Sequence, residues 1–166
     1  MNNYHATPYD LSALGFYFND YQDYQTKAGN HTNEYGEHVE EYEIQFIDGD
    51  NYELFKALGI TQANLETWFE DFENLDGDDL IRAIYMVEYL NIQMPDILDR
   101  LDEVDFFEGR AKEYAENYIE DRGLLDQMPE NLRYYFDTEA FARDMLLSGD
   151  ICEIEIMGKT YIIWDC

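Results

Sequence analysis

Residues of the types that carry out chemistry are scarce in this sequence. The histidines and cysteines are His5, His31, His38, Cys152 and Cys166, and none repeats at the spacing of a metal-binding motif. The acidic turns at residues 48–53 and 76–79 do not match a calcium loop, because glycine occupies the wrong position in each. Ser12 and Ser148 lack the sequence context of a catalytic nucleophile. We therefore expect no catalytic residue, no metal site and no cofactor.

Carboxylates dominate the composition instead. The 166 residues include 38 Asp and Glu against 10 Lys and Arg, which gives a formal net charge of −28. Such a balance excludes a nucleic-acid binder that neutralises phosphates, and it disfavours docking on an anionic membrane. Disordered acidic chains are poor in aromatic residues, whereas this chain is 46% hydrophobic and 16% aromatic. We expect a folded cytoplasmic protein with reduced thiols, because no secretory signal or membrane-length apolar run is present.

The acids recur three or four residues apart with few bases between them. Like charges at this spacing destabilise a helix, and the net charge opposes compaction, so such a surface suggests a cationic target. At the charge density of B-form DNA, 28 charges correspond to on the order of 48 Å of duplex, or roughly 14 base pairs per chain. The candidate acidic surface consists of Glu66, Glu70, Asp71, Glu73, Asp76, Asp78, Asp79, Asp96, Asp99, Asp102, Glu103, Glu113, Glu116, Glu120 and Asp121.

Hydrophobic periodicity and turn residues predict the elements that must position these acids. The expected strands are residues 14–18, 42–47 and 104–107, followed by a hairpin of 151–156 and 160–164 that turns at Gly158–Lys159 and places Cys152 near Asp165. The expected helices are 20–27 with Asn19 as N-cap, a segment ending at Gly59, one starting at Thr61, one opened by 76–79, one from Met94, one over 110–122, and short ones from Pro129 and Thr138.

This order of elements predicts an α+β fold, built as an elongated chain of small modules. Residues 1–58 form an N-terminal module of strands and a helix, and residues 59–103 form a central helical module. Residues 104–166 form a C-terminal module in which a helix accompanies a β-hairpin.

Several segments of the chain resemble one protein family. The segments are Tyr114–Gly123, Met128–Leu132, Tyr135–Asp144, Leu147–Asp150, and more loosely Gly15–Phe18 and Glu41–Asp48. They are similar to the ArdA antirestriction family, although Tyr17 stands where that family commonly has Trp, and the stretch before Gly15 is shorter than usual.

The resemblance implies a DNA mimic from a mobile element or phage, which occupies the DNA groove of type I restriction-modification enzymes as a homodimer. We expect no enzymatic activity of such an inhibitor and, from the acidic composition, no binding to nucleic acid or membrane. The family's antirestriction segment maps onto residues from Leu125 to Asp144, near its dimer contact. The interface candidates are Tyr134, Tyr135, Phe136 and Phe141, and an intramolecular core position is the alternative for each.

Other functions remain open on the residues alone. An immunity-type inhibitor of a basic nuclease or other DNA-binding protein would bind through a small hot spot. An acidic hydrolase would lose its activity when one catalytic carboxylate is substituted, whereas a DNA mimic would lose little from any single Asp→Asn substitution. Adaptation to high salt would scatter the acids uniformly over the surface.

Overall fold

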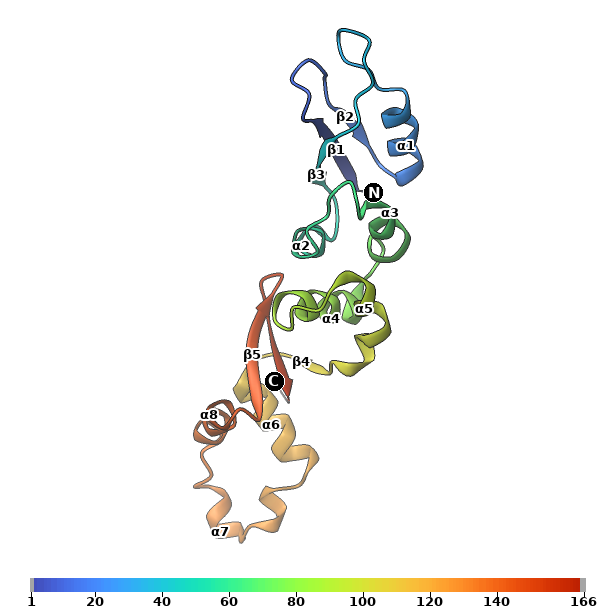
Figure 1. Ribbon diagram of the computed structural model, residues 1–166. Coiled ribbons are helices and arrows are strands. Elements are labelled where there is room, and N and C mark those ends of the chain that lie inside the picture. The colour runs from blue at the N-terminus through green and yellow to red at the C-terminus, as the bar shows by residue number, and fades with distance from the viewer. Residues whose placement is uncertain (1, 165–166) are drawn as a thin grey trace. The chain divides into compact units, whose positions relative to one another are not determined.

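The computed structural model describes residues 2–164 (Figure 1). The chain divides between Leu98 and Asp99 into two compact units, here called unit 1 and unit 2. Helices and small antiparallel sheets alternate along the sequence, so the predicted α+β class is confirmed. The finer division at residues 58 and 103 stays a prediction.

Unit 1 begins with a three-stranded antiparallel sheet in the order β2-β1-β3. Its strands are β1 (Asn3–Pro8), β2 (Phe16–Phe18) and β3 (Tyr42–Asp48). The pairings Tyr4↔Phe18 and Ala6↔Ile44 bring alternate residues of the three strands to one face, and this face is buried. The opposite face carries the polar side chains of His5, Thr7 and Gln45 together with the exposed ring of Tyr17.

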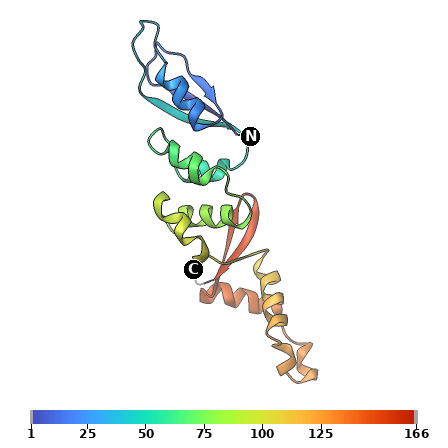
Figure 2. The same ribbon diagram turned by 90° about the vertical axis from the view of Figure 1, so that its right-hand side faces the viewer.

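Helices cover the apolar face of this sheet and continue beyond it. They are α1 (Tyr21–Gly29), α2 (Tyr52–Ala57), α3 (Leu65–Thr67), the π-helical turn η1 (Trp68–Phe72), α4 (Gly77–Glu88) and α5 (Met94–Arg100), whose last two residues belong to unit 2. Figure 2 shows α1 beside the sheet, where the Tyr24 and Phe18 rings lie 5.1 Å apart. The core of this unit is therefore largely aromatic, and its largest fully buried side chain is Trp68.

Unit 2 contains a second antiparallel sheet in the order β4-β6-β5. Its strands are β4 (Phe106–Glu108), β5 (Ile151–Ile156) and β6 (Lys159–Trp164). The predicted turn at Gly158–Lys159 is wrong, because Met157 and Gly158 hold the two positive φ angles, 52° and 73°. A two-residue hairpin turn of this kind favours glycine in its second position. Cys152 consequently pairs with Ile163 and not with Asp165.

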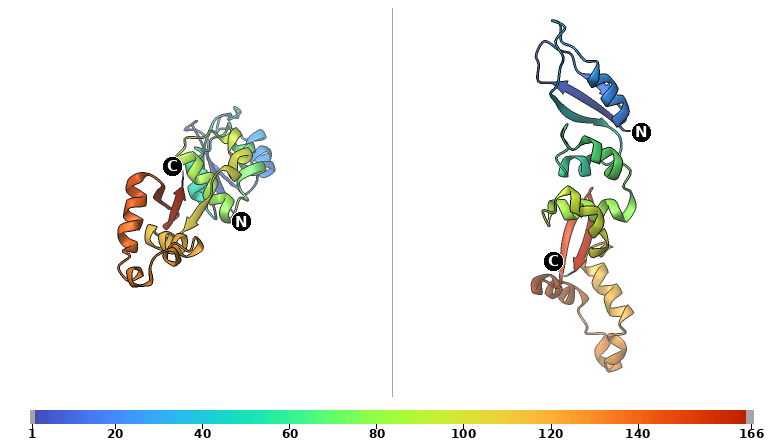
Figure 3. Two further views of the ribbon diagram at one scale, coloured as in Figure 1. Left: turned by 90° about the horizontal axis from the view of Figure 1, so that it is seen from below. Right: turned by 45° about the vertical axis from the view of Figure 1, so that its right-hand side comes forward.

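The helical part of unit 2 includes η2 (Leu101–Glu103), α6 (Ala111–Asp121), η3 (Leu125–Gln127), α7 (Glu130–Arg133) and α8 (Thr138–Ser148). Ala115 and Ala142 lie in the core that α6 and α8 share with Ile151 and Ile162 of the sheet. In both panels of Figure 3, α8 lies beside the β5–β6 hairpin. The small side chains allow α6 and α8 to approach closely.

Two further details differ from the sequence-based expectations. The strand β1 was not predicted, although it is the central strand of its sheet. The N-cap of α1 is Asp20 and not Asn19, since the Asp20 side chain accepts a hydrogen bond from the Asp23 N–H. The expectation of reduced thiols is wrong at Cys152, which is disulfide-bonded, while Cys166 lies outside the described residues.

Candidate functional site

The acids that the sequence singles out lie on the surface of the two units. Fourteen of the fifteen are exposed, and Glu73 is half-buried. Asp78 and Asp79 occupy the first turn of α4, where the positive end of the helix dipole stabilises them. The remaining exposed acids follow α3, η1, α5, η2 and α6, so helices present most of the predicted surface.

Basic residues neutralise little of this surface. Seven ion pairs join described residues, and two of them involve predicted acids: Asp79 with Arg82 at 3.0 Å and Glu103 with Arg100 at 2.8 Å. Exposed pairs of this kind are worth at most about 1 kcal/mol each. The surface therefore keeps a large excess of negative charge in the folded state.

Helix α6 shows how the fold separates its apolar and acidic sides. Ala111, Ala115 and Ile119 recur every four residues and are buried in the core of unit 2. Glu113, Glu116, Glu120 and Asp121 are exposed. With a rise of about 1.5 Å per residue, these four charges are about 4.5, 6 and 1.5 Å apart along the helix axis. Their average spacing of about 4 Å is close to the roughly 3.4 Å between charges on one DNA strand.

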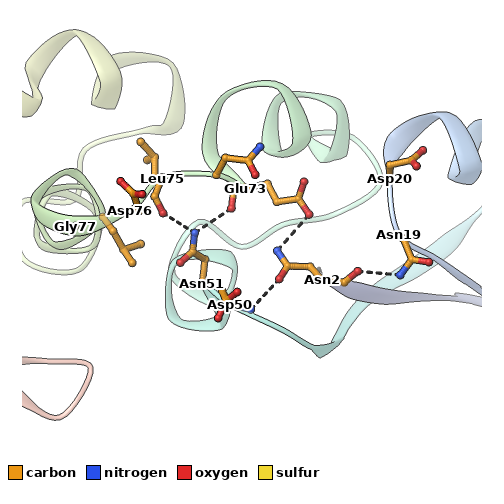
Figure 4. Close-up of a pocket in the computed structure, with 11 residues that line it drawn as sticks. Asn2, Asn19, Asp20, Asp50, Asn51, Glu73, Leu75, Asp76 and Gly77 are labelled. Carbon is orange, nitrogen blue, oxygen red and sulfur yellow. Dashed lines mark hydrogen bonds between the residues drawn. The ribbon is translucent and has the colours of Figure 1, made fainter.

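A cleft of about 580 Å³ in unit 1 gathers further carboxylates (Figure 4). Its charged lining consists of Asp20, Asp50, Glu73 and Asp76, and it includes neither lysine nor arginine. Asp20 and Asp50 were not among the predicted acids, because the sequence pattern places Asp20 at the start of a helix and Asp50 in a turn. Their convergence depends on the packing of segments far apart in the chain, which no local pattern reveals.

Asn2 and Asn51 brace the walls of this cleft. The Asn2 Nδ2 donates to Glu73 Oε1 at 3.2 Å, while its Oδ1 accepts from the Asp50 N–H at 2.8 Å. The Asn51 Nδ2 donates to the carbonyl oxygens of Glu73 and Leu75, at 2.9 and 2.7 Å (Figure 4). Glu73 is thus held by residues far away in the sequence, whereas Asp79, Glu103 and Glu113 contact a residue three positions away.

Tyr4 completes this polar network at the edge of the aromatic core. Its hydroxyl donates to Glu73 Oε1 at 3.0 Å and accepts from Trp68 Nε1 at 2.9 Å and from Asn2 Nδ2 at 3.2 Å. Burial raises the pKa of Tyr4 well above its ordinary value, and the nearby Glu73 carboxylate raises it further. The hydroxyl therefore stays protonated and serves as a structural link.

The interface candidates fall into two pairs. Tyr134 and Tyr135 are exposed, at 90% and 78%, and follow α7 in the antirestriction segment. Phe136 and Phe141 are half-buried; their rings lie 5.7 Å apart, and Phe141 packs against the core of unit 2. The first pair is available for an intermolecular contact, whereas the second contributes to the unit's own packing.

The described residues form neither a cluster of metal-ligating side chains nor a membrane-spanning helix. In residues 2–164, no three His, Cys, Asp or Glu side chains are grouped so that they could hold a metal ion. No helix in that part of the chain has the length and apolar character needed to span a membrane.

Fold and surface together define a class of protein: an α+β chain whose helices present exposed carboxylates with few bases to balance them. A comparison with known families matches residues 15–157 to the antirestriction protein (ArdA) family. The chain therefore belongs to the ArdA antirestriction family. No curated protein sequence matches it.

Proposed function

We propose that this chain is an antirestriction protein that mimics B-form DNA and competes with DNA for type I restriction-modification enzymes. The observation that carries the proposal is the row of exposed, largely unpaired carboxylates on helices such as α6. Carboxylates would occupy positions that the enzyme uses for phosphates, so inhibition is binding without turnover. Membership of the ArdA family supports the choice of target.

We also propose that the chain acts in the cytoplasm as a homodimer in which Tyr134 and Tyr135 contribute to the contact between copies. Both rings are large and exposed, and aromatic residues are enriched in protein interfaces. Replacing both with serine should convert the dimer to a monomer in sedimentation velocity, and an unchanged dimer would contradict this part of the proposal.

Neutralising the acids in the C-terminal half of α6 tests whether charge causes the inhibition. We expect the variant E116Q/E120Q/D121N to fold at least as well as the parent chain. Glu120 and Asp121 lie in the last turn of α6, where acids oppose the helix dipole, and Glu116 and Glu120 repel each other at a spacing of four residues. It should displace DNA from a type I enzyme several-fold less effectively. Its affinity should also depend less steeply on salt, by up to about 0.9 in the logarithmic slope per contacted charge.

A matched control keeps the charges and changes only the side-chain lengths. The variant E116D/E120D/D121E should compete with DNA as the parent chain does. If the parent chain, well folded and at low salt, fails to compete with duplex DNA for the enzyme, the proposed function is wrong. If the neutral and the charged variants behave alike, charge on α6 is not the cause of inhibition.

A further inference from the structure

Two loops lie side by side at one end of unit 1 (Figures 1 and 3). Both loops expose large apolar side chains. Residues 9–15 connect β1 to β2, and residues 30–41 connect α1 to β3; together they are called the two-loop tip. The exposed fraction is 101% for Leu11, 86% for Leu14, 75% for Tyr35 and 66% for Tyr9. Single exposed hydrophobic residues are ordinary, but four on two adjoining loops suggest a contact surface.

Hydrogen bonds hold the two loops together. Asp10 Oδ2 accepts from Asn33 Nδ2 at 2.8 Å, and Asp10 Oδ1 accepts from the N–H and hydroxyl of Ser12 at 2.9 and 2.6 Å. The Glu34 N–H donates to the Ser12 carbonyl oxygen at 3.1 Å. These bonds hold the pKa of the Asp10 carboxyl below its usual range, so the bracing carboxylate is ionised at neutral pH.

Asn33 is the buried centre of the second loop. It is 8% exposed, and its Oδ1 accepts from the N–H groups of Tyr35 and Glu37 at 3.0 and 2.9 Å. In the first loop, a Cβ at Gly15 would collide with the His5 ring and the Ala6 carbonyl oxygen, so close packing against β1 fixes its end. The apolar side chains are therefore displayed on ordered backbone, which lowers the entropy lost on binding.

The charge of the tip selects the kind of partner. Its two loops contain neither lysine nor arginine, and their acids are Asp10, Glu34, Glu37, Glu40 and Glu41. Two copies meeting tip to tip would bring like charges together, and an anionic membrane would be repelled as well. A protein that presents an apolar pocket edged by basic side chains complements both properties.

We infer that the two-loop tip binds an apolar, basic-rimmed pocket on the inhibited enzyme, beside its DNA channel. This inference rests on the proposed function and adds to it a contact that DNA cannot make, because a duplex backbone carries no aliphatic side chains. Tyr9, Leu11 and Leu14 precede the residues 15–157 that match the family, so this part of the tip lies outside the matched segment.

The test measures competition with DNA for a type I restriction-modification enzyme at several salt concentrations. The variant L11S/L14S should fold like the parent chain, because both side chains are exposed, and should compete at least about tenfold more weakly. Its salt slope should be unchanged, whereas E116Q/E120Q/D121N reduces that slope. The matched control is L147S, which removes a 78% exposed leucine of α8 and should compete like the parent.

The outcomes separate this inference from the proposed function. If the parent competes and L11S/L14S competes equally well, the tip inference is wrong and the proposed function stands. If L11S/L14S lowers the sedimentation coefficient of the free protein, a second copy occupies the tip, and the inference is again overturned. If the parent does not compete at low salt, the tip inference and the proposed function are both wrong.

Discussion

Tyr4 joins residues that lie far apart in the sequence of unit 1. Its hydroxyl contacts Asn2, Trp68 and Glu73, of which Trp68 is fully buried. Buried donors that lose their acceptor keep the full cost of removal from water, which is larger than the net value of a satisfied hydrogen bond. Stability at this position therefore depends on a single oxygen atom.

We predict that Tyr4→Phe lowers the free energy of unfolding by about 1–3 kcal/mol, because Trp68 Nε1 is left without its acceptor. Tyr24→Phe is the matched control: Tyr24 is also buried, but its hydroxyl hydrogen-bonds to none of the described residues. That control should be neutral or stabilising. Urea unfolding measures both, and equal effects of the two substitutions would contradict the assigned role of the Tyr4 hydroxyl.

Single residues also show where reasoning from sequence stops. The spacing of Glu113, Glu116 and Glu120 predicts an exposed helix face, and the structure places them there. Spacing also groups Glu73 with Glu66 and Glu70, but Glu73 turns inward to Asn2 and Tyr4. Asn2 and Tyr4 precede Glu73 by 71 and 69 residues, so no local sequence pattern reveals these hydrogen bonds.

At the scale of elements, capping residues fix where helices start. The Asp137 side chain accepts a hydrogen bond from the Ala140 N–H at 2.9 Å and caps α8, which shares the core of unit 2 with α6. We predict that Asp137→Ala costs about 1 kcal/mol of stability, with an expected range of about 0.5–2 kcal/mol.

The control for this substitution lies on the same helix. Asp144 is exposed and reaches Arg143 at 3.8 Å, a contact that contributes little. Asp144→Ala should therefore change the unfolding free energy by less than Asp137→Ala. Urea unfolding and amide hydrogen exchange in α8 measure the difference, and an equal loss in the two variants would refute the capping role.

Elements with strong local signals were predictable, and those that depend on pairing were not. Gly123, with a φ of 57°, ends α6 as the sequence indicates, and Asp76 is the N-cap of α4. In contrast, β1 contains Ala6 and Pro8, residues with low strand propensity, and owes its place to pairing on both edges. The hairpin turn lies one residue earlier than predicted. Each residue of β5 therefore pairs with a residue two positions earlier in β6 than the predicted turn implies.

At the scale of the whole molecule, charge acts on stability as well as on binding. The net charge of −28 opposes compaction, and salt screens this repulsion. Raising the ionic strength from 0.01 M to 0.1 M shortens the screening length from about 30 Å to about 10 Å. Composition gives the charge, but only the structure shows that so little of it is paired.

We therefore predict that added sodium chloride raises the urea midpoint of unfolding, while it weakens competition with DNA. E116Q/E120Q/D121N should show a smaller rise, because part of the repulsion is already removed. Urea is the suitable denaturant because it carries no charge of its own. A midpoint that stays constant or falls over this range would show that self-repulsion does not limit stability.

The separation of α6 into a buried apolar side and an exposed acidic side has a practical consequence for protein engineering. Ala111, Ala115 and Ile119 specify the packing of the helix, whereas the exposed Glu116, Glu120 and Asp121 lie outside the core. The outward pattern of anions can therefore be rewritten in combinatorial libraries without redesigning the hydrophobic contacts. Selection from such libraries could adapt the same backbone to cationic grooves of other shapes and spacings.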